Sequence, residues 1–474
     1  MDTATGALER IAAAVGPAGI VAPDAAAAML VDERRLYRGG ALAVVQPAST
    51  AEVAAVIGIC RDARLCVVPQ GGNTGYCGGA TPFDARREIL LSLARLNRIG
   101  ELDEVGFTLT ADAGVVLATA QAAARERGLL FPLSMGSEGS AQIGGALSTN
   151  AGGLAVLRYG TARELVLGLE VVLPSGEVLS DLGGLRKDNT GYDLKALFLG
   201  AEGTLGVITA AVLKLFPEPH ARETAWLAVP SVAAACRLLG RARRESGDRV
   251  VAAEYVSRPS LELVLRHVEG ARDPLAAAHA HYLLLELVSA EDASELGSAA
   301  ERMLAAGLEA GEIEDGALAA SEAQRADFWR LRERVPEAER REGGALKHDV
   351  SVRIARLPDL LARVEPALCA IAPHRVSVFG HIGDGNLHVN LLPPAGQALE
   401  PFRASVGERL TACVHDAAAA LGGSFSAEHG VGLLKVRELE RYEPPAALAL
   451  MHTLKRALDP DGLMNPGKVL RADE

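Results

Sequence analysis

One short segment of the chain carries two histidines separated by glycine-rich sequence. Residues 380–388 read GHIGDGNLH, and the apolar runs 376–382 and 387–392 have the composition of β-strands. The GDGN tetrapeptide between these runs suits a hairpin turn. If the hairpin closes around these four residues, His381 lies directly opposite His388, with Cβ atoms about 5 Å apart on one face. Two imidazoles at that separation can bind one metal ion.

A second motif offers further groups of the same chemistry. Residues 424–430 read SFSAEHG and place Glu428 beside a third histidine, His429. Two histidines and a carboxylate around an open coordination position form the pattern of a catalytic zinc site. A lone pair of histidines is more often structural than metal-binding, but the hairpin geometry and the nearby Glu-His pair favour the metal interpretation.

A basic segment lies between the glycine-rich loops of the first half and the histidine motifs. Residues 329–338 read WRLRERVPEA, and residues 346–351 read LKHDVS. By composition alone, the first of these is a charged and solvated helix face. The chain has a formal net charge of -12, however, so a carboxylate substrate would need a local basic pocket.

Glycine clusters dominate the first half of the chain. The first cluster, PQGGNTG at residues 69–75, follows an apolar run at 65–68, and adjacent glycines let backbone amides surround an anion such as a pyrophosphate. Further clusters at 136–153 and 200–206 indicate a large ligand threaded through several loops. No G-x-G-x-x-G motif occurs, which argues against a Rossmann site. Residues 462–468 mimic a P-loop, but Val469 replaces the required Ser or Thr, and we reject that interpretation.

Length and composition restrict the class of protein. A chain of 474 residues with 49% hydrophobic and 23% charged residues predicts two or three folded domains. The acidic net charge and the 4% aromatic content argue against nucleic-acid binding. Six cysteines without a C-x-x-C pair predict a reducing, cytoplasmic location. The acidic start of the chain predicts no signal peptide, and no apolar run is long enough to predict a membrane span.

The patterning along the chain predicts the elements that position these motifs. Residues 1–36 are Ala-rich, with the spacing of a leading helical segment. Strand and helix patterns then alternate, and the first domain closes near residues 217–219, before a second α+β domain that runs to about 425. The expected strands are 42–45, 65–68, the pair 165–173 and 177–179 around a Pro-Ser-Gly turn, and 282–288, and the expected helices are 50–62, 232–244 and 290–306.

Four motifs together carry a family resemblance. The chain resembles the vanillyl-alcohol oxidase type of FAD-binding flavoproteins and, within it, the D-lactate and D-2-hydroxyglutarate dehydrogenase family, over roughly residues 40–470. The resemblance implies an α+β fold with a helical segment at 1–36, an FAD-binding domain at 37–216, a substrate (cap) domain of antiparallel sheet and helices at 217–425, and a C-terminal segment at 426–474 that returns to the flavin. The motifs are PQGGNTG at 69–75, GSEGSAQIGGALSTNAGG at 136–153, EGTLGVIT at 202–209 and NPGK at 465–468.

The resemblance implies FAD as the cofactor. Because Asn73 stands where covalently flavinylated relatives place a histidine, we expect FAD to be bound non-covalently. Cys77 stands where a small apolar residue is usual, and we interpret it as a packed neutral thiol rather than a reactive one. The implied FAD-binding residues are Pro69, Gly71, Gly72, Asn73, Thr74, Gly75, Pro132, Gly136, Ser137, Gly144, Thr149, Asn150, Gly152, Gly153, Glu202, Gly206, Val207 and Asn465.

The resemblance also assigns roles around the histidines. It implies that a divalent metal, zinc or else manganese, binds His381, His388 and Glu428, and that His429 is the base that takes the substrate's hydroxyl proton while hydride leaves C2 for the flavin N5. It further implies substrate binding by three residues of the second domain, with the distal carboxylate held by the first two: Arg332, Lys347 and Asn390. Two positions depart from the family pattern: some members place a hydroxyl residue where Pro336 stands, and many have proline where Arg353 stands.

The predicted reaction is oxidation of a D-2-hydroxy acid, with D-2-hydroxyglutarate first and D-malate second. A D-lactate or glycolate dehydrogenase is the near alternative, although its substrate has no distal carboxylate. A zinc-dependent hydrolase and a non-catalytic flavin carrier are alternatives of other classes. The expected partners are the hydroxy acid, an electron acceptor such as an electron-transfer flavoprotein or a quinone, and a second copy of the chain in a homodimer.

Overall fold

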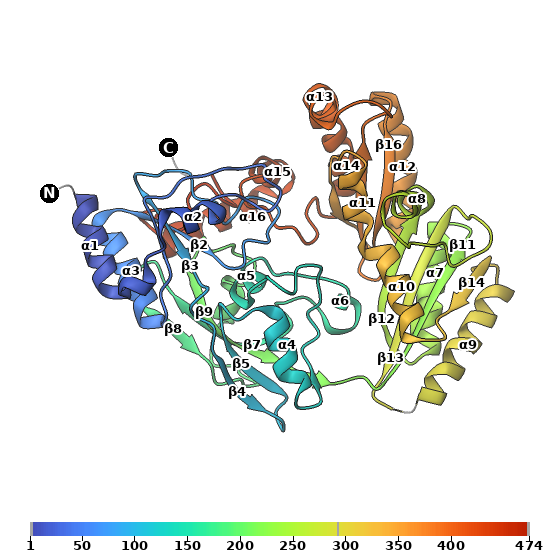
Figure 1. The fold of residues 1–474 in the computed structure, drawn as a ribbon, viewed down its shortest axis with the longest axis horizontal. Helices are drawn as coiled ribbons and strands as arrows, with labels where there is room; N and C mark the ends of the chain where they lie inside the picture. Colours follow the sequence, from blue (N-terminus) through green and yellow to red (C-terminus); the bar gives the residue numbers. More distant parts are fainter. Residues whose placement is uncertain (1–2, 292, 472–474) are drawn as a thin grey trace. The chain divides into compact units, whose positions relative to one another are not determined.

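The computed structural model describes residues 3–291 and 293–471, which divide into two compact units (Figure 1). The first unit consists of the described residues up to Gly152, of Gly160–Glu218 and of the described residues from Glu428 onward. The second unit consists of Gly153–Tyr159 and Pro219–Ala427. None of the helices within the described ranges is both long and apolar enough to cross a membrane.

The first unit contains a parallel sheet and an antiparallel sheet. The parallel sheet has the order β1-β3-β2, with β1 at Ala43–Val45, β2 at Cys66–Gln70 and β3 at Glu88–Ser92. The antiparallel sheet has the order β4-β5-β9-β7-β8, with β4 at Ile99–Asp103, β5 at Thr108–Asp112, β7 at Val166–Val172, β8 at Val178–Asp181 and β9 at Val207–Lys214. The predicted strands and the predicted pair around the Pro-Ser-Gly turn are therefore confirmed.

Helices connect and flank these sheets. The crossover from β1 to β2 is α3 (Thr50–Ala63), which confirms the helix predicted at 50–62 and begins where Ser49 Oγ accepts the amide of Glu52. The predicted leading segment contains α1, η1 and α2, while residues 1 and 2 lie outside the described residues. The remaining elements are α1 (Thr3–Val15), η1 (Pro17–Gly19), α2 (Pro23–Met29), α4 (Leu117–Arg125), β6 (Leu129–Leu130), α5 (Ile143–Ser148), η2 (Leu194–Leu197), β10 (Phe216–Pro217), α15 (Val436–Tyr442) and α16 (Pro445–Leu458).

The second unit is built on a seven-stranded antiparallel sheet. Its order is β14-β11-β13-β12-β16-β17-β15, so strands distant in the sequence are neighbours. The strand predicted at 282–288 is β13. The bounds are β11 (Ala221–Val229), β12 (Val250–Ser257), β13 (His281–Ser289), β14 (Asp315–Leu318), β15 (Asp349–Ser351), β16 (Arg375–His381) and β17 (Asn386–Leu392).

Both faces of this sheet are covered by helices. Alternate residues of β11 enter two separate hydrophobic cores, with Leu227 in one and Trp226 in the other. One core includes α7 (Val232–Glu245), α9 (Ala293–Glu309), α12 (Leu357–Ile371) and α14 (Glu408–Ala420), and the other includes α8 (Arg258–His267), α10 (Glu322–Glu333) and α11 (Val335–Arg341). Shorter elements are α6 (Val156–Tyr159), η3 (Ile354–Arg356), α13 (Leu399–Phe402) and η4 (Arg403–Gly407). Charged side chains in the middle of the central strands, such as Glu254 and Glu286, are consequently buried and must find partners.

Two of these helices were expected. The prediction at 232–244 is confirmed by α7, and the prediction at 290–306 corresponds to α9, which begins at Ala293. Residue 292 lies outside the described residues.

The histidine hairpin forms with a different register from the one predicted. Strands β16 and β17 pair so that His388 lies opposite Phe379, and the turn comprises residues 382–385. The prediction that His381 lies directly opposite His388 is therefore wrong by two residues. Because side chains alternate with period two, this even shift keeps both histidines on one face, and their ring centroids are 5.9 Å apart.

Candidate active site

The first two glycine motifs pack directly against each other. A Cβ on Gly72 would lie 2.0 Å from the carbonyl oxygen of Ser140, and a Cβ on Gly71 would lie 3.2 Å from Gly145 Cα. Only glycine allows the two backbones to approach this closely. These glycines are therefore required by the fold of the first unit, before any ligand is considered.

The third and fourth motifs join the same region. The amide of Glu202 donates to the carbonyl of Ser148 at 2.8 Å, and Asn465 Nδ2 donates to the carbonyl of Glu202 at 2.8 Å. A Cβ on Gly203 would lie 3.0 Å from Pro69 Cγ. The fold thus gathers all four motifs, although they span about four hundred residues of sequence.

Four predicted cofactor residues have left-handed backbone conformations. Such conformations are uncommon for residues other than glycine and are concentrated at functional sites. Their φ values are 54° for Asn73, 48° for Asn150, 52° for Glu202 and 43° for Asn465. The side chain of Asn73 donates to the carbonyl of Val31 at 2.9 Å, and this hydrogen bond stabilises the conformation of the loop.

The side chain of Glu202 ties the loop after the Glu-His-Gly motif to this region. Its two oxygens accept the amides of Val431 at 2.7 Å and Gly432 at 2.8 Å. Burial raises the pKa of Glu202, while these two amide donors act in the opposite direction. Nearby, Cys77 is buried with its Sγ 3.5 Å from the carbonyl oxygen of Gly430, which supports the packed-thiol interpretation.

Other predicted cofactor residues lie on the same loops. Gly206 precedes β9, Val207 is its first residue, and Gly153 begins the short segment 153–159 that groups with the second unit. Thr74 lies in the first motif. The others lie between β6 and α5, on α5 or shortly after it: Pro132, Gly136, Ser137, Gly144, Thr149 and Gly152.

Two observations fit a ligand in these loops. No described atom lies within 4 Å of the position of a Cβ on Gly75 or on Gly136, so neither glycine is required by packing. In addition, Gln142 Oε1 and Asn465 Oδ1 are buried without a hydrogen-bond partner among the described residues. Open space beside unconstrained glycines, with unsatisfied polar atoms nearby, is consistent with a bound flavin nucleotide.

The two kinds of glycine should respond differently to alanine. Gly72→Ala should lower the stability of the flavin-free protein by about 2 kcal/mol or more, because its Cβ meets backbone. Gly75→Ala should leave the flavin-free protein unchanged but weaken FAD binding by about tenfold or more. Thermal unfolding with and without FAD, together with flavin content, measures both effects. Wild-type flavin affinity in Gly75→Ala would contradict a ligand at this loop.

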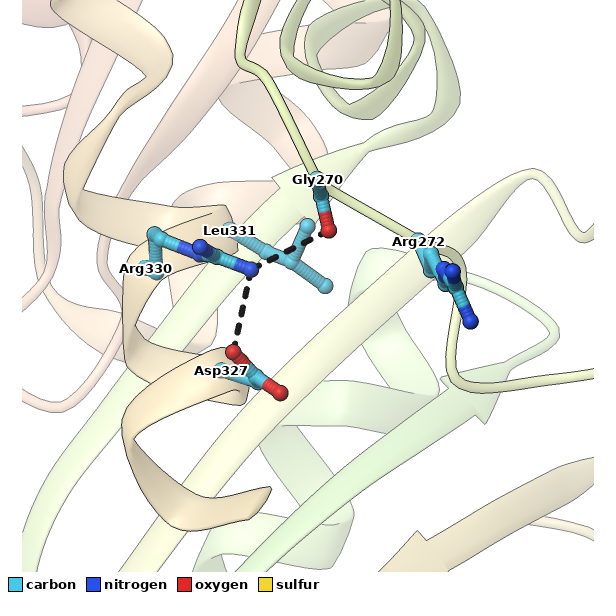
Figure 2. Close-up of a pocket in the computed structure, with 5 residues that line it drawn as sticks. All are labelled: Gly270, Arg272, Asp327, Arg330 and Leu331. Atoms are coloured by element: carbon cyan, nitrogen blue, oxygen red, sulfur yellow. Dashed lines mark hydrogen bonds and ion pairs between the residues drawn. The ribbon is translucent and has the colours of Figure 1, made fainter. Parts of the chain in front are cut away.

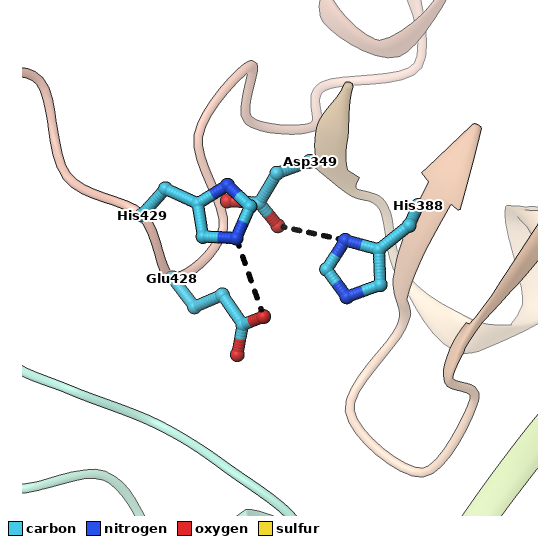
Figure 3. Close-up of side chains that lie close together, drawn as sticks. All are labelled: Asp349, His388, Glu428 and His429. Atoms are coloured by element: carbon cyan, nitrogen blue, oxygen red, sulfur yellow. Dashed lines mark ion pairs between the residues drawn. The ribbon is translucent and has the colours of Figure 1, made fainter. Parts of the chain in front are cut away.

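A cluster of four potential metal ligands lies beside the histidine hairpin. One ligand atom from each of Asp349, His388, Glu428 and His429 lies within 4.8 Å of the others (Figure 3). Asp349 is on β15 and His388 on β17, which are paired opposite each other. Glu428 and His429 directly follow Ala427, whose amide donates to the Asp349 carbonyl at 3.2 Å, so the backbone keeps them nearby. Two imidazoles and two carboxylates suit Zn²⁺ or Mn²⁺.

The cluster includes three of the four residues predicted for the metal and the base. The remaining one, His381, is not a member, and its Nδ1 lies 2.8 Å from Glu254 Oε1. Its ring is nevertheless adjacent to that of His388 on the same face of the sheet. Asp349, which was not predicted, lies 3.9 Å from His388 Nδ1 through its Oδ1. The assignment of His381 as a metal ligand stays a prediction.

Two arginines near the C-terminal end of helix α10, Arg330 and Arg332, have different environments. Arg330 lines a surface pocket with Gly270, Arg272, Asp327 and Leu331, and donates to Gly270 O and pairs with Asp327 (Figure 2). Arg332, by contrast, is buried, with only 5% of its surface exposed. The interpretation of this segment as a solvated face is therefore right for one arginine and wrong for the other.

Arg332 is held from two sides. Its Nε donates to Glu254 Oε2 at 2.7 Å, and its guanidinium carbon lies 4.9 Å from the centre of the Phe379 ring. The Phe379 ring is in turn 4.9 Å from that of His388. Burial would raise the pKa of Glu254, but His381 and Arg332 hold it below its usual value.

Lys347 and Asn390, the other predicted substrate residues, share one buried carboxylate. Glu339 is fully buried, and both of its oxygens accept Asn390 Nδ2 at 3.0 Å. Lys347 Nζ lies 3.3 Å from Glu339 Oε2. The Asn390 Oδ1 accepts the amide of His348 at 3.1 Å, which fixes the orientation of the side-chain amide.

Sequence reasoning missed three acidic residues of this region. For Glu254 a signal was present, because it is the single charged residue of the otherwise apolar strand Val250–Ser257. Asp349 similarly begins the short strand β15 beside Val350. Glu339 lies in a charge-rich helix, where nothing distinguishes one buried acid from its exposed neighbours.

Comparisons with known proteins identify the family of the chain. Residues 41–181 match the FAD binding domain family, and residues 218–469 match the C-terminal domain of FAD linked oxidases. The mitochondrial D-2-hydroxyglutarate dehydrogenase of Bos taurus is 42% identical over 444 residues, covering 93% of this chain and 79% of the relative. The D-2-hydroxyglutarate dehydrogenase of Xanthomonas citri pv. viticola is 40% identical over 444 residues, covering 94% and 92%.

Solved structures show the fold. p-Cresol methylhydroxylase superimposes with a TM-score of 0.77 at 16% identity, covering 99% of this chain and 97% of that one. The 4-ethylphenol oxidase of Gulosibacter chungangensis gives a TM-score of 0.73 at 17% identity, covering 100% and 98%. The fold is therefore that of the vanillyl-alcohol oxidase type of FAD-binding flavoproteins, as predicted.

The sequence matches define the family more narrowly. The chain belongs to the FAD-linked oxidase family, as an FAD-linked D-2-hydroxyacid dehydrogenase. This membership decides against the zinc hydrolase and the non-catalytic flavin carrier.

Proposed function

We propose that this enzyme oxidises D-2-hydroxyglutarate to the 2-keto acid, with D-malate as a second substrate. The proposal is supported by the relatives of about 40% identity that are named D-2-hydroxyglutarate dehydrogenases. When bound by the four motifs, FAD supplies the acceptor for the hydride that leaves C2 of the substrate. The protein's own task is then to orient the hydroxy acid and to remove its hydroxyl proton.

The observation that carries this choice of substrate is the environment of Arg332. Glu254 and Phe379 hold the guanidinium, but its two terminal nitrogens have no partner among the residues that the structure describes. Such a fork binds a carboxylate with two parallel hydrogen bonds. Arg332 and Lys347, each of which pairs with one buried glutamate, both present donors for a second carboxylate. Lactate and glycolate have no group to bind there.

One departure from the family pattern has a structural reason. Pro336 is the second residue of α11, where an amide donor is not needed and a fixed φ favours the helix. Proline there supplies no hydroxyl to the substrate, so Arg332 and Lys347 bear the recognition of the distal carboxylate in this proposal.

We further propose that a divalent metal, zinc or else manganese, binds His381, His388 and Glu428. Such an ion supplies Lewis acidity that makes the substrate hydroxyl more acidic. His429 accepts the hydroxyl proton in this scheme. Asp349, held by the side-chain amide of Asn386 at 2.9 Å, adds negative charge beside His388.

The test of the overall function is anaerobic reduction of the bound flavin. D-2-Hydroxyglutarate should bleach the flavin absorbance rapidly, D-malate more slowly, and D-lactate and glycolate least. Equal or faster bleaching by D-lactate would favour the near alternative. The L-enantiomer serves as the control for stereochemistry.

Removing the ammonium of Lys347 should discriminate between substrates. Lys347→Ala should raise KM for D-2-hydroxyglutarate by about 10- to 100-fold, because one charge-assisted hydrogen bond is lost, and should change KM for D-lactate little. Arg340→Ala, on the exposed surface of α11, is the matched control and should change neither value. Equal effects of Lys347→Ala on both substrates would contradict a role at the distal carboxylate.

The electron acceptor, the homodimer and the cytoplasmic location stay predictions. A panel of acceptors that includes an electron-transfer flavoprotein and a soluble quinone would address the first of these.

A further inference from the structure

One buried carboxylate, Glu254, contacts two residues of different predicted roles. It lies on β12 opposite His381 on β16 and has only 1% of its surface exposed. Its Oε1 lies 2.8 Å from His381 Nδ1, and its Oε2 accepts Arg332 Nε at 2.7 Å. Among the described residues, Glu254 is the one whose hydrogen bonds link the histidine hairpin to α10.

The hydrogen-bonding groups of this trio determine which ring nitrogen of His381 donates to Glu254. Glu254 and Arg332 form a buried ion pair. An ionised carboxylate can only accept hydrogen bonds, so the Nδ1–H group of His381 donates a hydrogen bond to Oε1. The proton on Nδ1 leaves the lone pair on Nε2, the atom that can bind a metal.

We propose that Glu254 is a positioning residue that fixes both the tautomer of His381 and the direction of the Arg332 guanidinium. It thereby couples the metal site to the distal-carboxylate site through one side chain. The inference rests on the proposed roles of His381 and Arg332. A buried ion pair contributes little net stability compared with well-packed apolar residues, which favours a functional reason for this carboxylate.

The variant Glu254→Gln separates the effect of Glu254 on the His381 tautomer from its effect on the orientation of Arg332. Arg332 Nε cannot accept a hydrogen bond, whereas imidazole Nδ1 can. The glutamine must therefore direct its carbonyl to Arg332 and its NH₂ to His381, which moves the imidazole proton from Nδ1 to Nε2. The Arg332 contact is retained, but the metal-binding lone pair is lost.

The matched control is Glu286→Gln. Glu286 is also buried on the same sheet, on β13 opposite Ala252 of β12. Its Oε2 accepts Trp329 Nε1 and Thr224 Oγ1, both at 2.8 Å, and a glutamine carbonyl can accept both. Like Glu254 it also pairs with arginine, since Arg222 and Arg325 each lie 3.7 Å from one of its oxygens. A general effect of neutralising a buried acid in this core would appear equally in both variants.

The experiment measures metal affinity without turnover. The FAD-loaded full-length protein is stripped of metal and titrated with Zn²⁺ in competition with a chromophoric chelator. Glu254→Gln should bind Zn²⁺ about 10- to 100-fold more weakly, which is typical of a lost partner behind a histidine ligand, and Glu286→Gln should match the wild type. At saturating metal, KM of Glu254→Gln for D-2-hydroxyglutarate should stay close to the wild-type value.

The outcomes are distinguishable. Wild-type Zn²⁺ affinity in Glu254→Gln, or an equal loss in Glu286→Gln, would overturn the positioning role and leave the proposed function intact. Absence of Zn²⁺ and Mn²⁺ binding by the wild type would overturn the proposed metal site, and with it this inference.

Discussion

Chelation of the divalent metal should lower the rate of flavin reduction by D-2-hydroxyglutarate by about 10³-fold or more. A Lewis acid stabilises the transition state by several kcal/mol. Removing the metal removes this stabilisation, and each loss of about 1.4 kcal/mol lowers the rate about tenfold. The clustering of Asp349, His388, Glu428 and His429 motivates the prediction. Stopped-flow absorbance of the flavin measures it before chelation, after chelation and after addition of Zn²⁺ or Mn²⁺.

Variants localise the effect to the cluster. His388→Ala should reproduce the chelated state and should not be rescued by added metal. His374→Ala is the matched control, because His374 lies outside the cluster with its Nδ1 near the carbonyl of Ala372, and it should retain activity. Flavin content should be unchanged throughout, since the four flavin motifs lie elsewhere in the sequence. Full activity in the presence of a strong chelator would contradict metal dependence.

Replacement of His429 by Gln should lower the rate of flavin reduction by about 10²- to 10⁴-fold, the contribution typical of a positioned general base. The His429 ring packs edge-on against Tyr76, with centroids 4.9 Å apart, which restricts its orientation. Metal content should remain at the wild-type level if His429 is the base. Glu428→Gln should instead lose metal, so the pair of variants separates the two roles.

The alternative role for His429 is that of a metal ligand. Its nitrogen belongs to the cluster of potential ligands, and Nε2 lies 3.8 Å from Glu428 Oε1. Loss of metal in His429→Gln, to the same extent as in Glu428→Gln, would show that His429 is a ligand and that the base assignment is wrong. Metal analysis of the purified variants is sufficient to decide this.

The sequence by itself determined the local elements of this protein and the family to which it belongs. The crossover helix α3, the turn between β7 and β8 and the strand β13 follow from capping, turn chemistry and hydrophobic pattern, which depend on neighbouring residues. The glycine motifs identified the flavoprotein family, and some of their glycines reflect a close approach of backbones, as at Gly72 and Ser140. These signals need no knowledge of distant contacts.

The tertiary structure alone decided which side chains meet. The period of two placed His381 and His388 on one face, but the pairing across the hairpin depends on the conformation of its turn, so the register was two residues away from the prediction. Asp349 joined the cluster because β15 pairs with β17, and Glu254 met His381 because β12 pairs with β16. Strand pairing between segments that are not adjacent in the sequence is set by the packing of the whole sheet, which no local pattern in the sequence records.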